Sequence, residues 1–125
     1  MWPDNGVPSP LDPLVRFVRQ VRHEMNRFPT MGPTIIHCSA GVGRTGTFVG
    51  IDKLLQDYKN KSYVDIFGMV YEMRMSRCLM VQTEVKFRTI KIFGKSLPVV
   101  DFSMTDNFGE STYSYENLDA VYLSA

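Results

Sequence analysis

Apolar side chains recur at helical spacing in the first quarter of the chain, beginning just after Asp12-Pro13. Proline is common in the first turn of a helix, because the N–H that it lacks would have no intrahelical partner there. The pattern predicts a helix that starts at Asp12 and keeps Arg16, Arg19 and Arg22 on its outer face. The positions expected to face the core are Leu14, Phe17, Val18, Val21, Met25 and Phe28.

An apolar run, Thr34-Ile35-Ile36, follows Gly32-Pro33 and predicts a core strand over residues 34–38. A strand needs a neighbour for its backbone N–H and C=O groups, and no second strand is predicted from the sequence. We therefore expect the chain to be a fragment of a larger domain or a piece of a larger assembly.

Three further segments carry apolar residues at helical spacing and predict helices over residues 44–60, 64–77 and 83–95. The expected fold class is thus α/β, mostly helical in this chain, with the one core strand leading into the loop before the second helix. No apolar run is long enough to span a membrane.

Charge divides the chain into two parts. Residues 1–95 hold all 14 Lys and Arg and have a net charge of +6, whereas residues 96–125 hold five acidic residues and no basic ones. The acidic part has no helical period and is expected to be a mostly disordered tail. The basic part suits an anionic partner, but it has no aromatic-interleaved nucleic-acid motif, so nucleic acid is not an expected partner.

The run His37-Cys38-Ser39-Ala40-Gly41-Val42-Gly43-Arg44-Thr45-Gly46 places a thiol and a guanidinium on either side of a glycine-rich loop. A thiol becomes a strong nucleophile as thiolate, and N–H groups that converge at a helix N-terminus favour this form. Arg44 could bind two phosphate oxygens through its planar guanidinium. The run predicts a phosphate-binding loop with a nucleophile, Cys38, at its base.

Other interpretations of the same residues exist. Cys38 alone would more often be a small core residue, and with Cys78 it could form a disulfide or a zinc site, although the spacing fits neither. Residues 41–46 also spell G-x-G-x-x-G, the dinucleotide fingerprint, with Asp65 as the acidic partner. That interpretation leaves Cys38 and Arg44 without a role, so we favour the phosphate loop and expect no cofactor and no metal.

Two further motifs, Trp2-Pro3-Asp4 and Met80-Val81-Gln82-Thr83-Glu84, flank this loop in the sequence. Together the three motifs resemble the protein-tyrosine phosphatase family over about residues 1–95. The resemblance implies that residues 1–95 are the C-terminal part of a catalytic domain with a cysteine-phosphatase fold, and that residues 96–125 form a tail. It further implies a classical phosphatase that acts on phosphotyrosine proteins, and the tail is similar to those of the receptor-type, single-domain subgroup. A reactive free thiol indicates a reducing compartment, so the expected location is the cytoplasm, either free or as the intracellular part of a membrane receptor.

The resemblance assigns a role to each catalytic residue. Cys38 would attack phosphorus to form a phosphocysteine, Arg44 would bind the transferred phosphoryl group, and Asp4, on a mobile flap, would protonate the leaving tyrosine oxygen. The backbone N–H groups expected to bind phosphate oxygens belong to the loop residues Ser39, Ala40, Gly41, Val42 and Gly43.

Gln82 would orient the hydrolytic water in the second step of this reaction. Four residues later the sequence departs from the family pattern, because Lys86 stands where a second glutamine is expected, and an ammonium cannot accept a hydrogen bond from water. The residues expected to support the site are His37, Thr45, Trp2, Arg74 and Arg77.

The tail contains Tyr115-Glu116-Asn117-Leu118. Phosphorylation of Tyr115 would create a dianion of the kind that arginine pockets bind. The motif is similar to docking sites for Src-homology-2 domains that prefer Asn two residues after the tyrosine. The alternatives to catalysis are therefore a catalytically impaired fragment that binds phosphotyrosine, or an adaptor that acts through Tyr115.

Overall fold

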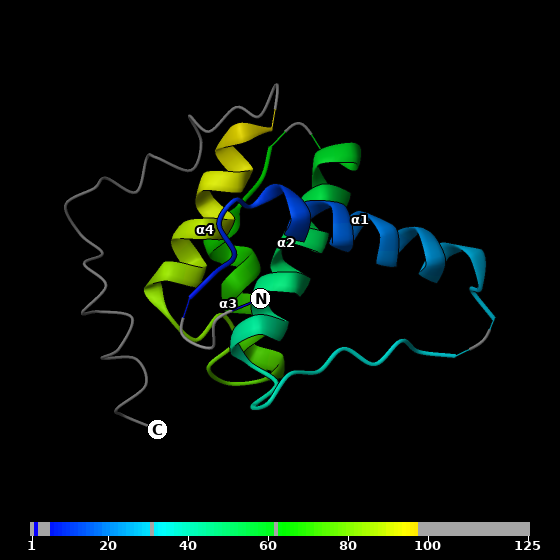
Figure 1. The fold of residues 1–125 in the computed structure, drawn as a ribbon, viewed down its shortest axis with the longest axis horizontal. Coiled ribbons are helices and arrows are strands. Elements are labelled where there is room, and N and C mark those ends of the chain that lie inside the picture. The colour runs from blue at the N-terminus through cyan, green and yellow to red at the C-terminus, as the bar shows by residue number, and fades with distance from the viewer. Residues whose placement is uncertain (1, 3–5, 31, 62, 98–125) are drawn as a thin grey trace.

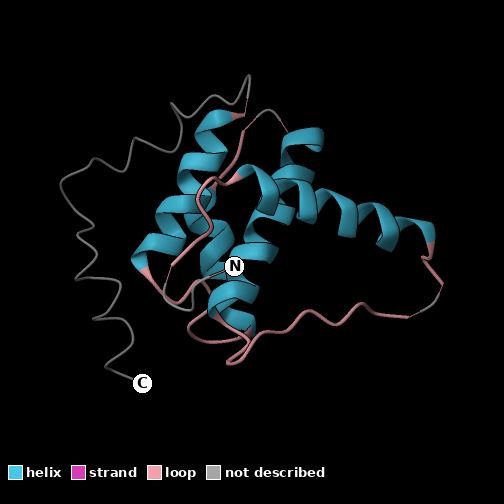
Figure 2. Ribbon diagram, in the orientation of Figure 1, coloured by secondary structure: helices cyan, strands magenta, loops and turns pink. Residues whose placement is uncertain are grey.

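The computed structural model describes residues 2, 6–30, 32–61 and 63–97, and this part of the chain folds into four helices (Figures 1 and 2). They are α1 (Asp12–Arg27), α2 (Gly43–Asn60), α3 (Ile66–Ser76) and α4 (Glu84–Ser96). The four predicted helices are confirmed, with ends that differ by at most two residues. Asp4 and the tail with Tyr115 lie outside the described residues.

Helix α2 is the centre of the fold, because α1, α3 and α4 all pack against it (Figure 1). Its buried face holds residues as small as Gly46 and Gly50, which let the neighbouring segments approach the helix backbone closely. Ile51, Leu54 and Ile90 are fully buried between the helices. None of the helices in the described ranges is both long and apolar enough to cross a bilayer.

Helix α3 begins with a side-chain cap that the sequence analysis did not identify. Asp65 accepts a hydrogen bond from the Gly68 backbone N–H at 2.8 Å, which satisfies one of the unpaired donors of the first turn. A Cβ on Gly68 would overlap the Asp65 carboxylate. The glycine inside this helix is therefore explained by its contact with the cap.

The strand predicted over residues 34–38 is not confirmed. Residues 32–38 run as extended chain with no ladder partner, and the described part of the chain contains helices but no strand (Figure 2). Ile35, predicted to be a core residue, is 84% exposed. Apolar β-branched residues favour extended backbone, but a strand also needs a second extended segment to pair with, and no described segment forms a ladder with it.

Two positions predicted to face the core from α1 are half exposed. Phe17 rests its ring edge-on against Phe48 of α2, with centroids 5.7 Å apart, and Phe28 lies under the Arg27 guanidinium. The far end of α1 extends beyond the other helices (Figure 1), so apolar periodicity continues there without a surface to pack against.

Arg22, predicted to point outward, instead joins α1 to α2. Its guanidinium donates two hydrogen bonds to the carboxylate of Asp52, with the Nε–Oδ1 distance at 2.9 Å, and Gln56 donates to the same carboxylate. Asp52 is 5% exposed. A nearly buried carboxylate needs such partners, because an uncompensated buried charge is costly.

Replacing Arg22 with Gln is expected to lower the free energy of unfolding by roughly 1.5–3 kcal/mol, the usual worth of hydrogen bonds to a charged group. The matched control is Arg27→Gln, which removes the exposed Arg27–Glu24 pair on the same helix and should cost below about 1 kcal/mol. Urea unfolding followed by circular dichroism measures both. Equal losses in the two variants would show that the Arg22–Asp52 contact contributes no more than a surface pair.

Candidate active site

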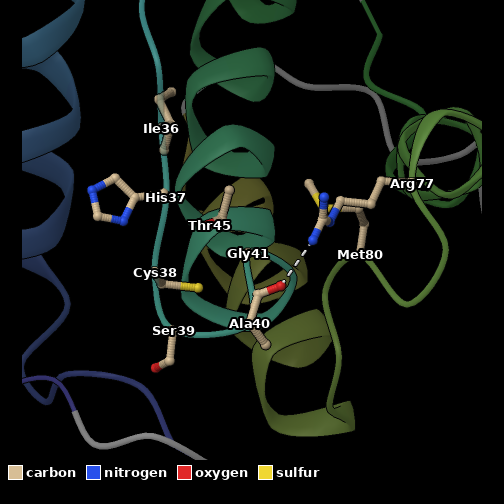
Figure 3. A pocket seen from close by; sticks show the side chains of 9 residues that line it. All are labelled: Ile36, His37, Cys38, Ser39, Ala40, Gly41, Thr45, Arg77 and Met80. Atoms are coloured by element: carbon tan, nitrogen blue, oxygen red, sulfur yellow. Dashed lines mark hydrogen bonds between the residues drawn. The ribbon is translucent and has the colours of Figure 1, made fainter.

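The glycine-rich loop and the start of α2 border an open cavity of about 320 Å³ beside the Cys38 side chain (Figure 3). The Cys38 sulfur points inward, toward Thr45 on the first turn of α2, while His37 points to the other side of the chain. The cavity is lined by Ile36, His37, Cys38, Ser39, Ala40, Gly41, Thr45, Arg77 and Met80.

The Cys38 thiol is perturbed toward its anionic form. Burial raises the pKa of the Cys38 thiol, but hydrogen bonds from the Thr45 hydroxyl and from the backbone N–H groups of Thr45, Gly41 and Val42 outweigh this and lower it to about 7. Thr45 Oγ1 is buried and has no partner at full hydrogen-bond geometry in the described structure, so its hydroxyl favours the thiolate from a longer range. The donors that favour the thiolate come from residues 41, 42 and 45.

The shape of the loop depends on Gly41 and Arg77. Gly41 has a φ of +72°, in the left-handed region that favours glycine. Arg77 reaches the loop from the end of α3 and donates a hydrogen bond of 3.0 Å to the carbonyl oxygen of Ala40 (Figure 3). A Cβ at position 41 would lie 3.2 Å from Arg77 Nη2, so the glycine also leaves room for the guanidinium.

A second segment, residues 79–82, packs against the loop from the side of α4. The Val81 backbone N–H donates to the carbonyl oxygen of Val42 at 3.0 Å, and a Cβ on Gly46 would overlap the Val81 backbone nitrogen. The thiol loop and the segment that carries Gln82 are thus joined backbone to backbone.

Arg74 holds this second segment in an unusual conformation. Leu79 and Val81 have φ values of 64° and 59°, which L-residues, and β-branched ones above all, rarely adopt. The Arg74 guanidinium donates hydrogen bonds to the carbonyl oxygens of Met80, at 2.8 Å, and Val81, at 3.3 Å. These charge-assisted bonds offset part of the strain.

Arg44 lies at the edge of the site. Its guanidinium donates a hydrogen bond of 2.7 Å to the Ser39 hydroxyl, and it is not among the residues that line the cavity. Trp2, a predicted supporting residue, is half-buried against the core and donates from Nε1 to the Gly6 carbonyl oxygen. Asp4 lies outside the described residues.

Gln82 and Lys86 meet at the first residue of α2. The Gln82 Oε1 atom lies 3.0 Å, and the Lys86 Nζ atom 2.9 Å, from the point that a Cβ on Gly43 would occupy. Gln82 is exposed, but Lys86 is completely buried, with 0% exposure. The sequence analysis identified Lys86 as a departure from the family pattern but gave no sign of its burial.

The structure brings together the Cys38 loop, Thr45, Arg74, Arg77 and Gln82. It adds the backbone of Val81 and the side chain of Met80, for which the sequence alone gave no signal beyond their place beside Gln82. In the described part of the chain, no group of three or more His, Cys, Asp or Glu side chains could hold a metal ion.

Comparison with known proteins places the sequence in a family. The model of the protein-tyrosine phosphatase family matches residues 1–91. The chain therefore belongs to the protein-tyrosine phosphatase family.

Its relatives are receptor-type members of that family. The chain is 51% identical over 86 residues to the mouse receptor-type tyrosine-protein phosphatase eta, and 48% and 46% identical to human receptor-type phosphatases H and C. Each match covers 69% of this chain but only 7%, 8% and 6% of those relatives. The chain thus spans less than a tenth of the length of the curated relatives it matches.

The Cys38 thiol should react with iodoacetamide at a rate that rises with pH and reaches half its maximum near pH 7, because the thiolate is the reacting form. Replacing Thr45 with Val removes the hydroxyl that donates to the sulfur and should raise this midpoint. The measurement is made in a Cys78→Ser background, so that only Cys38 is labelled. Thr89→Val, which removes a hydroxyl bonded to Val85 within α4, is the control. An unchanged midpoint in Thr45→Val would contradict the assignment.

Proposed function

We propose that this chain carries the catalytic centre of a phosphotyrosine-protein phosphatase that works through a phosphocysteine intermediate. The observation that carries the proposal is the Cys38 sulfur, whose pKa is lowered to about 7 by N–H and hydroxyl donors that converge on it. Family membership supports phosphotyrosine hydrolysis in general. The thiolate supplies the nucleophile that a phosphocysteine route needs.

In the first step, the Cys38 thiolate attacks phosphorus and the bond from phosphorus to the tyrosine oxygen breaks. Asp4 protonates the departing oxygen, which leaves as neutral tyrosine, and the enzyme keeps an S–P bond. The N–H groups of residues 39–43 and the Arg44 guanidinium bind the three phosphoryl oxygens. For this, Arg44 exchanges its hydrogen bond to Ser39 for bonds to phosphate.

In the second step, water attacks phosphorus, the S–P bond breaks, and Cys38 leaves as thiolate. Asp4, now a carboxylate, accepts a proton from the water, and Gln82 orients that water. The Gln82 carbonyl oxygen lies beside Gly43 of the loop, which supports this role. The Thr45 hydroxyl stabilises the sulfur as it regains its negative charge.

The proposed assignment of the chain follows from the match over residues 1–91. We assign residues 1–95 to the catalytic domain and residues 96–125 to a tail. The substrates are phosphotyrosine proteins, and the net charge of +6 in residues 1–95 suits an anionic phosphopeptide. A free Cys38 thiol requires a reducing compartment, so we place the chain in the cytoplasm.

The full chain should hydrolyse p-nitrophenyl phosphate, a substrate whose good leaving group scarcely needs an acid. Cys38→Ser should abolish this activity, because the hydroxyl is not ionised near neutral pH, while Cys78→Ser, which changes the other, exposed cysteine, should retain it. Release of p-nitrophenolate measures both. If the unsubstituted chain shows no more activity than Cys38→Ser but still binds orthovanadate, the chain is a phosphotyrosine-binding fragment that does not turn over.

A separate role is proposed for the tail, on the basis of Tyr115-Glu116-Asn117 in the sequence. Phosphorylated Tyr115 would dock Src-homology-2 domains that read Asn two residues later. A synthetic phosphopeptide of this segment should bind such a domain in a fluorescence-polarisation assay, and Asn117→Ala should weaken binding at least ten-fold. Equal affinity of the two peptides would dismiss the site.

A further inference from the structure

Lys86 is the one completely buried charged side chain among the described residues, with 0% exposure. Lysine is almost never fully buried, since removing an ammonium from water is costly unless negative charge or hydrogen bonds compensate. Of its two neighbours along α4, Val85 is half exposed and Phe87 is partly buried. The Lys86 side chain itself extends toward α2. The position of this charge relative to the Cys38 loop is therefore of interest.

The ammonium lies at the positive end of α2. Nζ and Cε of Lys86 are 2.9 and 3.3 Å from the point that a Cβ on Gly43 would occupy, and Gly43 is the first residue of the helix. The first N–H groups of a helix carry partial positive charge. An anion bound in the loop would therefore be attracted both by the helix N-terminus and by the Lys86 ammonium.

We propose that Lys86 is a positioning residue of the phosphate site, whose ammonium strengthens the binding of tetrahedral oxyanions by the Cys38 loop. It is not among the residues that line the cavity, so its charge acts across Gly43 and not by direct contact. This inference rests on the proposed function, because it takes the loop to be a phosphate site. It explains how a cation can stand where the family pattern has a second glutamine.

The absence of a side chain at Gly43 makes this arrangement possible. A Cβ there would lie 2.9 Å from Lys86 Nζ and 3.0 Å from Gln82 Oε1, closer than ordinary van der Waals contact. The glycine therefore lets the ammonium approach the helix start. A unit charge within roughly 10 Å of a dianion, in surroundings with an effective dielectric constant of ~20, changes the affinity for that anion about ten-fold or more.

The test measures orthovanadate binding by the full chain with Cys78→Ser, through protection of Cys38 from iodoacetamide. Lys86→Gln should weaken the apparent vanadate affinity about ten-fold or more, and Lys86→Arg, which keeps the charge, should stay within about three-fold of the parent chain. Lys91→Gln is the matched control, because it removes the same charge from an exposed position on α4 and should change nothing. Circular dichroism and thermal unfolding verify that each variant is folded.

Lys86→Met, which keeps the aliphatic stem, serves as the second neutral variant. If vanadate protects the parent chain and both folded neutral variants equally well, the inference about Lys86 is overturned and the proposed function stands. If vanadate does not protect the parent chain, the loop is no phosphate site, and both proposals fail. If neither neutral variant folds while Lys86→Arg does, Lys86 is a structural residue and the inference is overturned.

Discussion

The hydrogen bond from the Val81 N–H to the Val42 carbonyl oxygen joins the two segments from which the site is built. One segment carries the thiol and the converging N–H groups, and the other carries Gln82. The contact exists because Gly46 has no side chain to separate them. The position of Gln82 relative to Cys38 is therefore fixed by main-chain atoms, and the first turn of α2 serves as the common base of both segments.

The helices were predictable because the sequence signals for a helix lie within the helix itself and at its ends. Apolar spacing, the Pro13 start and the glycine and proline residues between segments gave ends within two residues of the observed ones. The prediction of a strand over residues 34–38 was wrong, because extended residues become a strand only beside a partner segment. Phe17 and Phe28 were misplaced for a similar reason, since periodicity defines a helix face but not what covers it.

The residues of the site could be named from the sequence, but their environment could not. The motif around Cys38 predicts a phosphate loop through residue types at fixed spacing. Three features depend on how the helices meet, and no local pattern encodes them. They are the positive φ of Val81, the carbonyl acceptors of Arg74 and the burial of Lys86. The environment also decides the chemistry, because donors from residues 41, 42 and 45 give Cys38 its thiolate character.

Arg74 donates hydrogen bonds to two backbone oxygens of the segment after α3, those of Met80 and Val81. These two bonds do not depend on which side chains the two residues bear. Met80 lines the cavity, so a substitution at this position can reshape the cavity wall without releasing the backbone. The shape of the cavity can therefore change at position 80 while the surrounding main chain keeps its conformation.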